Sequence, residues 1–181
     1  MQVLRSLKGF KVRSLSANTH WEELAAQAAE FKPDRVCIAD SRYAGELRKR
    51  LEPLGIEVLT GADALKELAS DDETDIVLLG IVGAAGLAPA LAAVESRKRL
   101  ALANKESLVM AGSILMSLAR EKGAEVLPVD SEHSAIFQSL RAGRRSELRK
   151  VIITASGGPF YCLSKHELRH VTREQALCHP T

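Results

Sequence analysis

The chain has 181 residues, of which 46% are hydrophobic and 27% are charged, a composition typical of a soluble globular protein. Its formal net charge of +2 is too small to predict binding to nucleic acid or to an anionic membrane. Aromatic residues make up only 4% of the chain, which also disfavours a surface on which bases would stack.

Three cysteines, Cys37, Cys162 and Cys178, lie far apart in sequence and form no CxxC pair. We therefore expect free thiols in a reducing compartment. Residues 1–11 lack the long apolar core of a signal peptide, so we expect a cytoplasmic protein.

The uncharged segment 76–94 is nearly long enough to cross a membrane. It is interrupted by Gly80, Gly83, Gly86 and Pro89, and acidic residues precede it. A buried strand, a glycine turn and an alanine-rich helix explain this segment better than a membrane span does.

Hydrophobic periodicity predicts strands that alternate with helices along the chain. We expect strands at 9–16, 35–39, 55–59, 75–79, 100–103, 125–129 and 151–155, and helices at 21–31, 41–51, 62–68, 87–96, 108–121 and 132–140. Residues 1–7 resemble the last turns of a further helix. This alternation implies right-handed crossovers and therefore an α/β fold with a doubly wound, Rossmann-like parallel sheet.

A pair of carboxylates, Asp130 and Glu132, follows the expected strand at 125–129. In an open parallel sheet, ligands bind at the carboxyl ends of the strands. If the backbone stays extended, both carboxylates project to one side and offer the hard oxygen ligands that suit Mg2+ or Mn2+. A second interpretation, compatible with the first, is that Asp130 or Ser131 caps the following helix.

Two further segments follow strands in the same way. The turn at 80–86 has the spacing GxxGxxG, which could bring backbone N–H groups to a phosphate or ribose but differs from the GxGxxG dinucleotide fingerprint. Close packing of a helix on a strand is the alternative for these glycines. At the next strand end, Lys105 could neutralise a phosphate or an oxyanion and Asn104 could orient a polar group, or Lys105 and Glu106 could form a surface pair.

Consecutive glycines after Ser156 could form a nest of N–H groups that binds an anion. His133 and His179 receive no role, because a lone histidine more often makes a structural hydrogen bond.

Four segments together resemble the 1-deoxy-D-xylulose 5-phosphate reductoisomerase family. They are IVGAAGL at 81–87, ALANKESLV at 101–109, LPVDSEHSAIFQ at 127–138 and SGGPF at 156–160. The resemblance implies an NADPH-dependent enzyme of the non-mevalonate isoprenoid pathway. Such an enzyme rearranges 1-deoxy-D-xylulose 5-phosphate and reduces the product to 2-C-methyl-D-erythritol 4-phosphate. It also implies a cytosolic homodimer that uses Mg2+, Mn2+ or Co2+ and acts on a small sugar phosphate.

The resemblance assigns roles to the residues around the strand ends. Asp130 and Glu132 would be metal ligands, Lys105 and Glu132 catalytic, and Lys105, Ser131, Glu132 and Ser156 in contact with substrate. Gly83, Asn104 and Glu106 would lie along NADPH. Asn18, in the more weakly matched turn at 17–20, would lie near the adenosine 2'-phosphate.

The resemblance also implies two domains. Residues 1–129 would be the NADPH-binding domain without its first strand and its GSTGSIG-type phosphate loop, and residues 130–181 the start of an α+β catalytic domain without the third metal carboxylate. From these departures we expect the isolated chain to be poorly stable and inactive. The alternative is a non-catalytic remnant that at most binds nucleotide or a partner. Another kind of Rossmann dehydrogenase is disfavoured, because residues 130–133 would have no role in simple hydride transfer.

Overall fold

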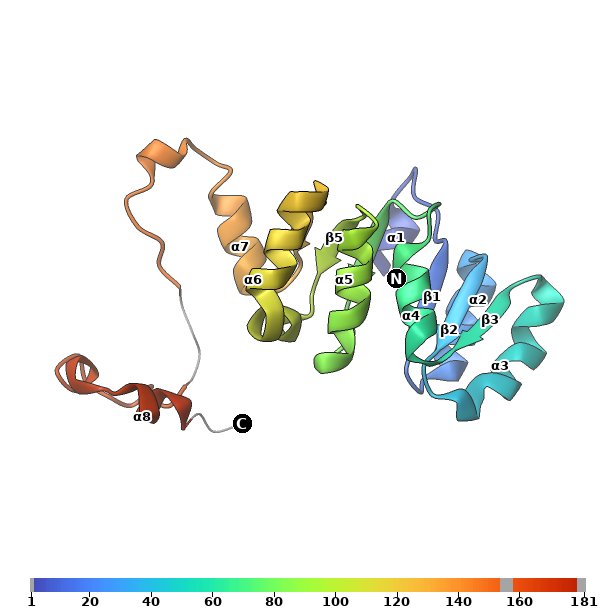
Figure 1. The fold of residues 1–181 in the computed structure, drawn as a ribbon, viewed down its shortest axis with the longest axis horizontal. Helices are drawn as coiled ribbons and strands as arrows, with labels where there is room; N and C mark the ends of the chain where they lie inside the picture. Colours follow the sequence, from blue (N-terminus) through green and yellow to red (C-terminus); the bar gives the residue numbers. More distant parts are fainter. Residues whose placement is uncertain (1, 154–157, 179–181) are drawn as a thin grey trace. The chain divides into compact units, whose positions relative to one another are not determined.

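The computed structural model describes residues 2–153 and 158–178, and the chain divides into two compact units, Met1–Ser134 and Ala135–Thr181. The first unit contains all of the described strands. Its two halves each carry a three-stranded parallel sheet, with strand orders β1-β2-β3 and β4-β5-β6 (Figure 1).

The first sheet is built by the amino-terminal part of the chain. Its elements are α1 (Gln2–Ser6), β1 (Ser14–Ala17), α2 (Trp21–Phe31), β2 (Arg35–Ile38), η1 (Ser41–Tyr43), α3 (Ala44–Leu51), η2 (Glu52–Leu54), β3 (Glu57–Thr60) and α4 (Gly61–Ser70). The apolar faces of α2 and α3 bury against the sheet, and Val36, Ile38 and Leu47 are fully buried there. Each such side chain stabilises the fold by about 1.5–3 kcal/mol relative to its exposed state.

The second sheet is built in the same way. Its elements are β4 (Ile76–Leu79), η3 (Ala84–Gly86), α5 (Leu87–Glu95), β5 (Arg99–Leu102), α6 (Lys105–Lys122), β6 (Val126–Pro128) and α7 (Ser131–Ser139), whose last residues belong to the second unit. Val94, Leu100 and Leu115 are fully buried between the strands and helices. The helices α4, α5 and α6 pack side by side, so that α4 joins the two halves (Figure 1).

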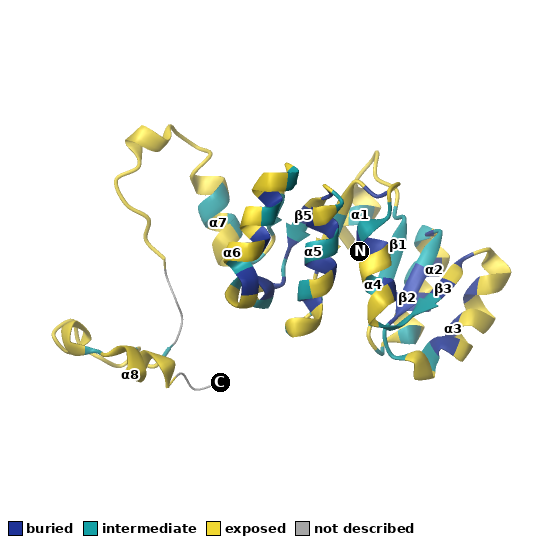
Figure 2. Ribbon diagram, viewed as in Figure 1, coloured by how far each residue is buried: buried dark blue, intermediate teal, exposed yellow. Residues whose placement is uncertain are grey.

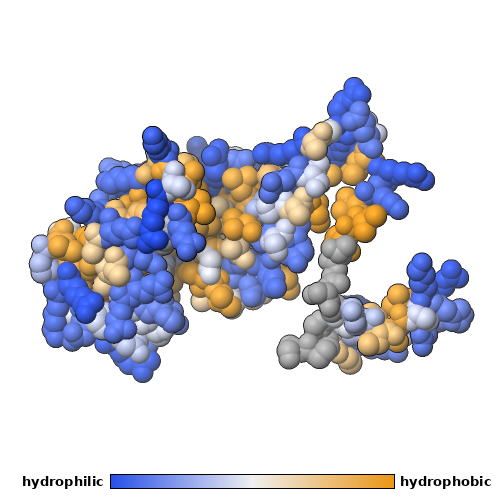
Figure 3. Space-filling model, turned by 180° about the vertical axis from the view of Figure 1, so that it is seen from behind, coloured by the Kyte–Doolittle hydropathy of each residue, from blue (hydrophilic) through white to orange (hydrophobic). Residues whose placement is uncertain are grey.

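The α/β alternation and the parallel strand pairing expected from the sequence are confirmed. The expected single sheet, however, is divided, because none of the described strands pairs with the outer edge of β1 or of β4. On β4, Ile76 and Leu78 are 38% and 68% exposed, so an apolar part of this strand faces solvent. Figure 3 shows further hydrophobic side chains at the surface of the first unit.

The second unit contains little regular structure. It holds the end of α7, the short helices η4 (Arg145–Glu147), η5 (Glu167–His170) and α8 (Arg173–Leu177), and no residue of its described part is buried (Figure 2). The strand expected at 151–155 is wrong for residues 151–153, which are exposed and extend without a strand partner. An apolar run becomes a strand only where a neighbour satisfies its backbone groups. Residues 154 and 155 lie outside the described part.

None of the helices in the described residues is both long enough and apolar enough to cross a lipid bilayer. The segment 76–94 instead forms β4, a turn with η3, and α5. The order of strand, turn and helix is confirmed, but the expectation of a buried strand is wrong for most of β4, in which only Leu79 is buried.

Two arginines at the amino ends of the first sheet connect it to the segment that leads into β4. Arg35 forms ion pairs with Glu67 at 2.6 Å and with Asp71 at 2.7 Å, and Arg13 forms an ion pair with Glu73. Partial burial raises the pKa of Asp71, but the hydrogen bonds from Arg35 and from the backbone N–H of Glu73 outweigh that effect and hold it below its usual value. The folded state therefore favours the ionised form of Asp71.

We expect Leu115→Ala to lower the free energy of unfolding by about 2–5 kcal/mol, because it leaves a cavity in a fully buried position. Urea titration of the chain measures the change. Ile114→Ala, at a neighbouring position of the same helix that is 62% exposed, should change stability by only about 0.5 kcal/mol. Equal effects of the two substitutions would contradict the assignment of the core.

We expect Asp71→Asn to lower the free energy of unfolding by about 1–2 kcal/mol at neutral pH. Because the folded pKa of Asp71 is depressed, its contribution is present above the usual value of about 3.9 and disappears as pH falls through the folded pKa. Urea titrations at neutral and at acidic pH should therefore show the difference from wild type shrinking in acid. Asp63→Asn, which removes an exposed pair with Lys66, is the control and should have little effect. A difference that persists in acid would show that Asp71 acts through something other than its charge.

Candidate functional site

The predicted site residues come together at one edge of the second sheet. Parallel pairing places Leu79 opposite Leu102 and Leu102 opposite Pro128, so the segments that follow β4, β5 and β6 leave the sheet at the same edge. Backbone hydrogen bonds from Ala103 to Leu79 and from Val129 to Leu102, both 2.9 Å, continue this alignment past the strands. This is the edge where ligands bind in parallel α/β sheets.

Asn104 is the most buried polar residue at this edge after Ser107, with 2% of its surface exposed. Its Nδ2 donates to the carbonyl oxygens of Ile81 at 2.6 Å and Gly83 at 3.0 Å, and also lies 3.0 Å from Oε2 of Glu106. Its Oδ1 accepts the backbone N–H of Ser107 at 2.8 Å and the Ser107 hydroxyl. Asn104 therefore joins the turn after β4 to the first turn of α6.

The cap formed by Asn104 explains where α6 begins. The apolar pattern predicted a start at residue 108, but the helix begins at Lys105 because Asn104 satisfies the Ser107 N–H. Lys105 is consequently the first residue of the helix and is exposed, while Glu106 is partly buried beside Asn104. Ser107, for which no binding or catalytic role was predicted, is completely buried.

The glycine turn has two different physical roles. Gly83 adopts φ +74°, a conformation that favours glycine, and no atom lies within 4 Å of where its Cβ would be. At Gly86, by contrast, a Cβ would lie 2.8 Å from Cγ of Asn104. Gly86 is thus required for close packing, but against the Asn104 side chain and not against a strand as predicted, whereas the space beside Gly83 leaves room for a ligand to approach.

Asp130 caps α7. Its Oδ1 accepts the backbone N–H of His133 at 3.3 Å and lies 3.7 Å from Nδ1 of the same residue. The expectation of an extended backbone from Asp130 to Glu132 is wrong, because α7 already begins at Ser131. The second interpretation from the sequence, that Asp130 or Ser131 caps the following helix, is thus confirmed for Asp130.

The carboxylates nevertheless remain close enough to influence each other. The Ser131 hydroxyl donates to Oε2 of Glu132 at 2.6 Å, and this bond is the main reason why the pKa of Glu132 lies below its usual value. The charge of Asp130 raises this pKa and the charge of Lys105 lowers it. Three predicted site residues from two different strand ends, Lys105, Asp130 and Glu132, thus share one electrostatic environment.

The donor set suits a hard divalent cation only in part. Among the described residues, no group of three or more histidine, cysteine, aspartate or glutamate side chains could hold a metal ion. Two exposed or half-buried carboxylates match the way Mg2+ is often held, with water and substrate oxygens filling the remaining positions. The roles of Asp130 and Glu132 as metal ligands stay a prediction, because the first turn of α7 replaces the extended backbone on which that prediction rested.

Two predicted residues lie elsewhere. Asn18 follows β1 in the other sheet, where it is exposed and its carbonyl accepts the N–H of Asp40 at 3.1 Å. Ser156 lies outside the described residues, so its predicted contact with phosphate stays a prediction.

Comparison with known proteins identifies one family. The family model of 1-deoxy-D-xylulose 5-phosphate reductoisomerase matches residues 1–112, and the model of the C-terminal domain of that enzyme matches residues 126–181. The reductoisomerase of Ruminiclostridium cellulolyticum is 45% identical over 99% of this chain and 48% of its own length. That of Laribacter hongkongensis is 44% identical over 98% of this chain and 47% of its own length.

Solved structures show the same relationship. The reductoisomerase from Zymomonas mobilis in complex with NADPH aligns with a TM-score of 0.81 and 43% identity, covering 97% of this chain and 46% of that one. A DOX-P reductoisomerase in complex with NADPH, fosmidomycin and magnesium aligns with a TM-score of 0.77 and 34% identity, covering 98% and 46%. The chain thus spans about half the length of its relatives. On this match across nearly all of its residues, the chain belongs to the 1-deoxy-D-xylulose 5-phosphate reductoisomerase family.

Proposed function

We propose that the gene product carrying this chain converts 1-deoxy-D-xylulose 5-phosphate to 2-C-methyl-D-erythritol 4-phosphate by rearrangement and NADPH-dependent reduction. This is an NADP-dependent oxidoreductase reaction of the non-mevalonate isoprenoid pathway. The observation that carries the proposal is the parallel alignment of β5 and β6, which brings the segments that carry Lys105, Asp130 and Glu132 to one edge of the sheet. Relatives that carry the name of this enzyme, and one crystallised with NADPH and magnesium, support it.

The side chains at this edge suit the chemistry of the substrate. Asp130 and Glu132 would hold Mg2+ or Mn2+, with Co2+ as a further option, and the bound cation would polarise substrate oxygens as a Lewis acid. The Lys105 ammonium would stabilise negative charge on a substrate oxygen, and its exposed position at the start of α6 makes it accessible. Ser131 and Glu132 would contact substrate hydroxyls, and Ser156 would contact its phosphate.

The glycine turn suits the cofactor. The positive φ of Gly83 and the open space around Gly80 and Gly83 allow a ligand to approach the backbone closely. NADPH would lie along this turn, Asn104 and Glu106. Its adenosine end would lie near Asn18, where the chain leaves β1.

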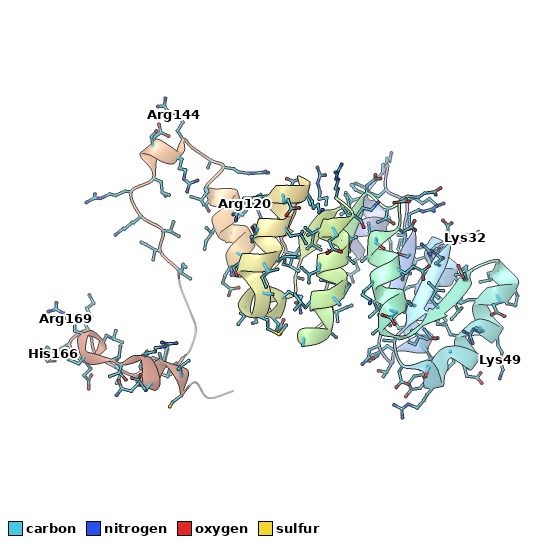
Figure 4. The ribbon with its side chains drawn as sticks, in the orientation of Figure 1. Lys32, Lys49, Arg120, Arg144, His166 and Arg169 are labelled. Carbon is cyan, nitrogen blue, oxygen red and sulfur yellow. The ribbon has the colours of Figure 1, made fainter. Side chains whose placement is uncertain are left out.

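Charge and exposure agree with a small-molecule substrate. The exposed basic side chains Lys32, Lys49 and Arg120 come from different elements and point away from the ribbon (Figure 4). Within the proposal, the enzyme is a cytoplasmic homodimer that binds neither nucleic acid nor membrane. The alternative of a remnant that only binds nucleotide or a partner is not favoured, because the relatives found by sequence and by structure carry the enzyme's name.

We expect Glu132→Gln in the full-length gene product to lower kcat by at least about 100-fold and to raise the Mn2+ concentration needed for half-maximal rate, because it removes half of the carboxylate pair. Substrate-dependent NADPH oxidation at several Mn2+ concentrations measures both. Glu121→Gln, at an exposed position of α6, is the control and should leave both values unchanged. If the Glu132→Gln enzyme needs the same Mn2+ concentration as the wild type for half-maximal rate, the assignment of Glu132 as a metal ligand is wrong.

We expect Lys105→Met to lower kcat/KM by about 100- to 1,000-fold, because it removes the cation that faces the developing charge. Steady-state NADPH oxidation measures the effect at saturating Mn2+. Lys122→Met, at the other end of the same helix, should leave kcat/KM at the wild-type value. Loss of activity in both variants would point to a general effect of charge and not to a specific role of Lys105.

A further inference from the structure

We infer that Asn104 is a positioning residue whose amide shapes the cofactor turn from behind, and that Gly86 lacks a side chain so that Asn104 can occupy that position. This rests on the proposed function, since it concerns how the same site receives NADPH. In this inference, the Asn104 side chain does not itself contact the cofactor.

The hydrogen-bonding capacity of the Asn104 side chain is already used within the protein. A carboxamide has two N–H donors and two acceptor lone pairs. The Nδ2 group faces three acceptors, on Ile81, Gly83 and Glu106, and the Oδ1 atom accepts two bonds from Ser107. Turning the amide over would place its oxygen against two carbonyls and a carboxylate, so the orientation is fixed by this network. With 2% of Asn104 exposed, neither a donor nor an acceptor remains for a ligand.

The same bonds determine which way the turn presents its own donors. All peptide bonds in the described chain are trans, and in a trans peptide the C=O and the following N–H point in opposite directions. Because the carbonyls of Ile81 and Gly83 point towards Asn104, the N–H groups of Val82 and Ala84 point away from it. These N–H groups are therefore turned away from the buried amide, in a turn where Val82 is 82% exposed and Ala84 is also exposed. They suit hydrogen-bond acceptors of the cofactor, such as a carboxamide or phosphate oxygen.

Gly86 provides an independent way to disturb Asn104. A Cβ at this position would lie 2.8 Å from Cγ and 3.0 Å from both Nδ2 and Oδ1 of Asn104, so a methyl group there must displace the amide. Gly86 is buried and has no side chain that could touch a ligand. Its substitution therefore removes the bridge to the turn without removing any group that could contact NADPH.

The test uses the full-length gene product with the variants Asn104→Ala, Gly86→Ala and the double variant. Two quantities are measured: the NADPH dissociation constant, and amide hydrogen exchange over residues 81–86 without NADPH. We expect each single variant to weaken NADPH binding by about 10- to 100-fold and to accelerate exchange in the turn. The double variant should bind NADPH as Asn104→Ala does, because the added methyl then has room. Gly112→Ala is the matched control, since its Cβ would meet Leu108 only at 3.8 Å.

Three outcomes would overturn the inference. The first is that Gly86→Ala binds NADPH as the wild type does while Asn104→Ala loses affinity. The second is that the losses of NADPH affinity add up in the double variant. The third is that amide hydrogen exchange over residues 81–86 is unchanged in both single variants. If the wild-type protein binds no NADPH, the proposed function fails, whereas hydrogen exchange still decides the role of Asn104. Accelerated exchange in the single variants would then support the positioning role of Asn104, and unchanged exchange would refute it.

Discussion

The side chain of Asn104 is the interaction on which the rest of the site depends. It satisfies two carbonyls of the turn after β4 and, at the same time, the N–H of Ser107 in the first turn of α6. The Gly83 carbonyl also accepts the N–H of Gly86 at 3.3 Å. For the Ile81 carbonyl and the Ser107 N–H, leaving the group without Asn104 would cost about 1–3 kcal/mol each. One amide thus fixes both the cofactor turn and the position of Lys105, which follows it directly in sequence.

Local patterns in the sequence predicted the elements better than they predicted their pairing. The alternation of strands and helices is confirmed because each element carries its own hydrophobic period. Strand limits differ where pairing decides them: β1 covers 14–17 and not 9–16, because only these residues pair with β2. The strand expected at 151–153 does not form for the same reason, since these residues pair with none of the described strands. Contacts between distant segments decide where these strands begin and end, and a single sequence does not show those contacts.

The position of the candidate site was predictable, but its geometry was not. Asp130 follows an apolar strand, and strand ends in a parallel sheet converge, so sequence alone places it near Lys105. The direction of Glu132 depends on whether the backbone is extended or helical, and the cap made by Asp130 itself starts the helix one residue before Glu132. Similarly, the spacing of Gly86 suggested phosphate binding or packing. Only the position of Asn104, which is distant in sequence, decides for packing.

The two units differ in how much buried hydrophobic surface stabilises them, and the candidate site lies in the unit that has the buried core. The described part of the second unit has no buried residue, and Ile152 and Ile153 are each 70% exposed, so little hydrophobic free energy of its own orders it. The first unit has a buried core on each sheet, and it supplies Lys105, Asp130 and Glu132 together with the bonds that orient them. The carboxylate pair and the cofactor turn are therefore preorganised by the first unit. Within that unit, Asn104 and the cap of α7 determine where the predicted cofactor turn and the predicted metal ligands lie.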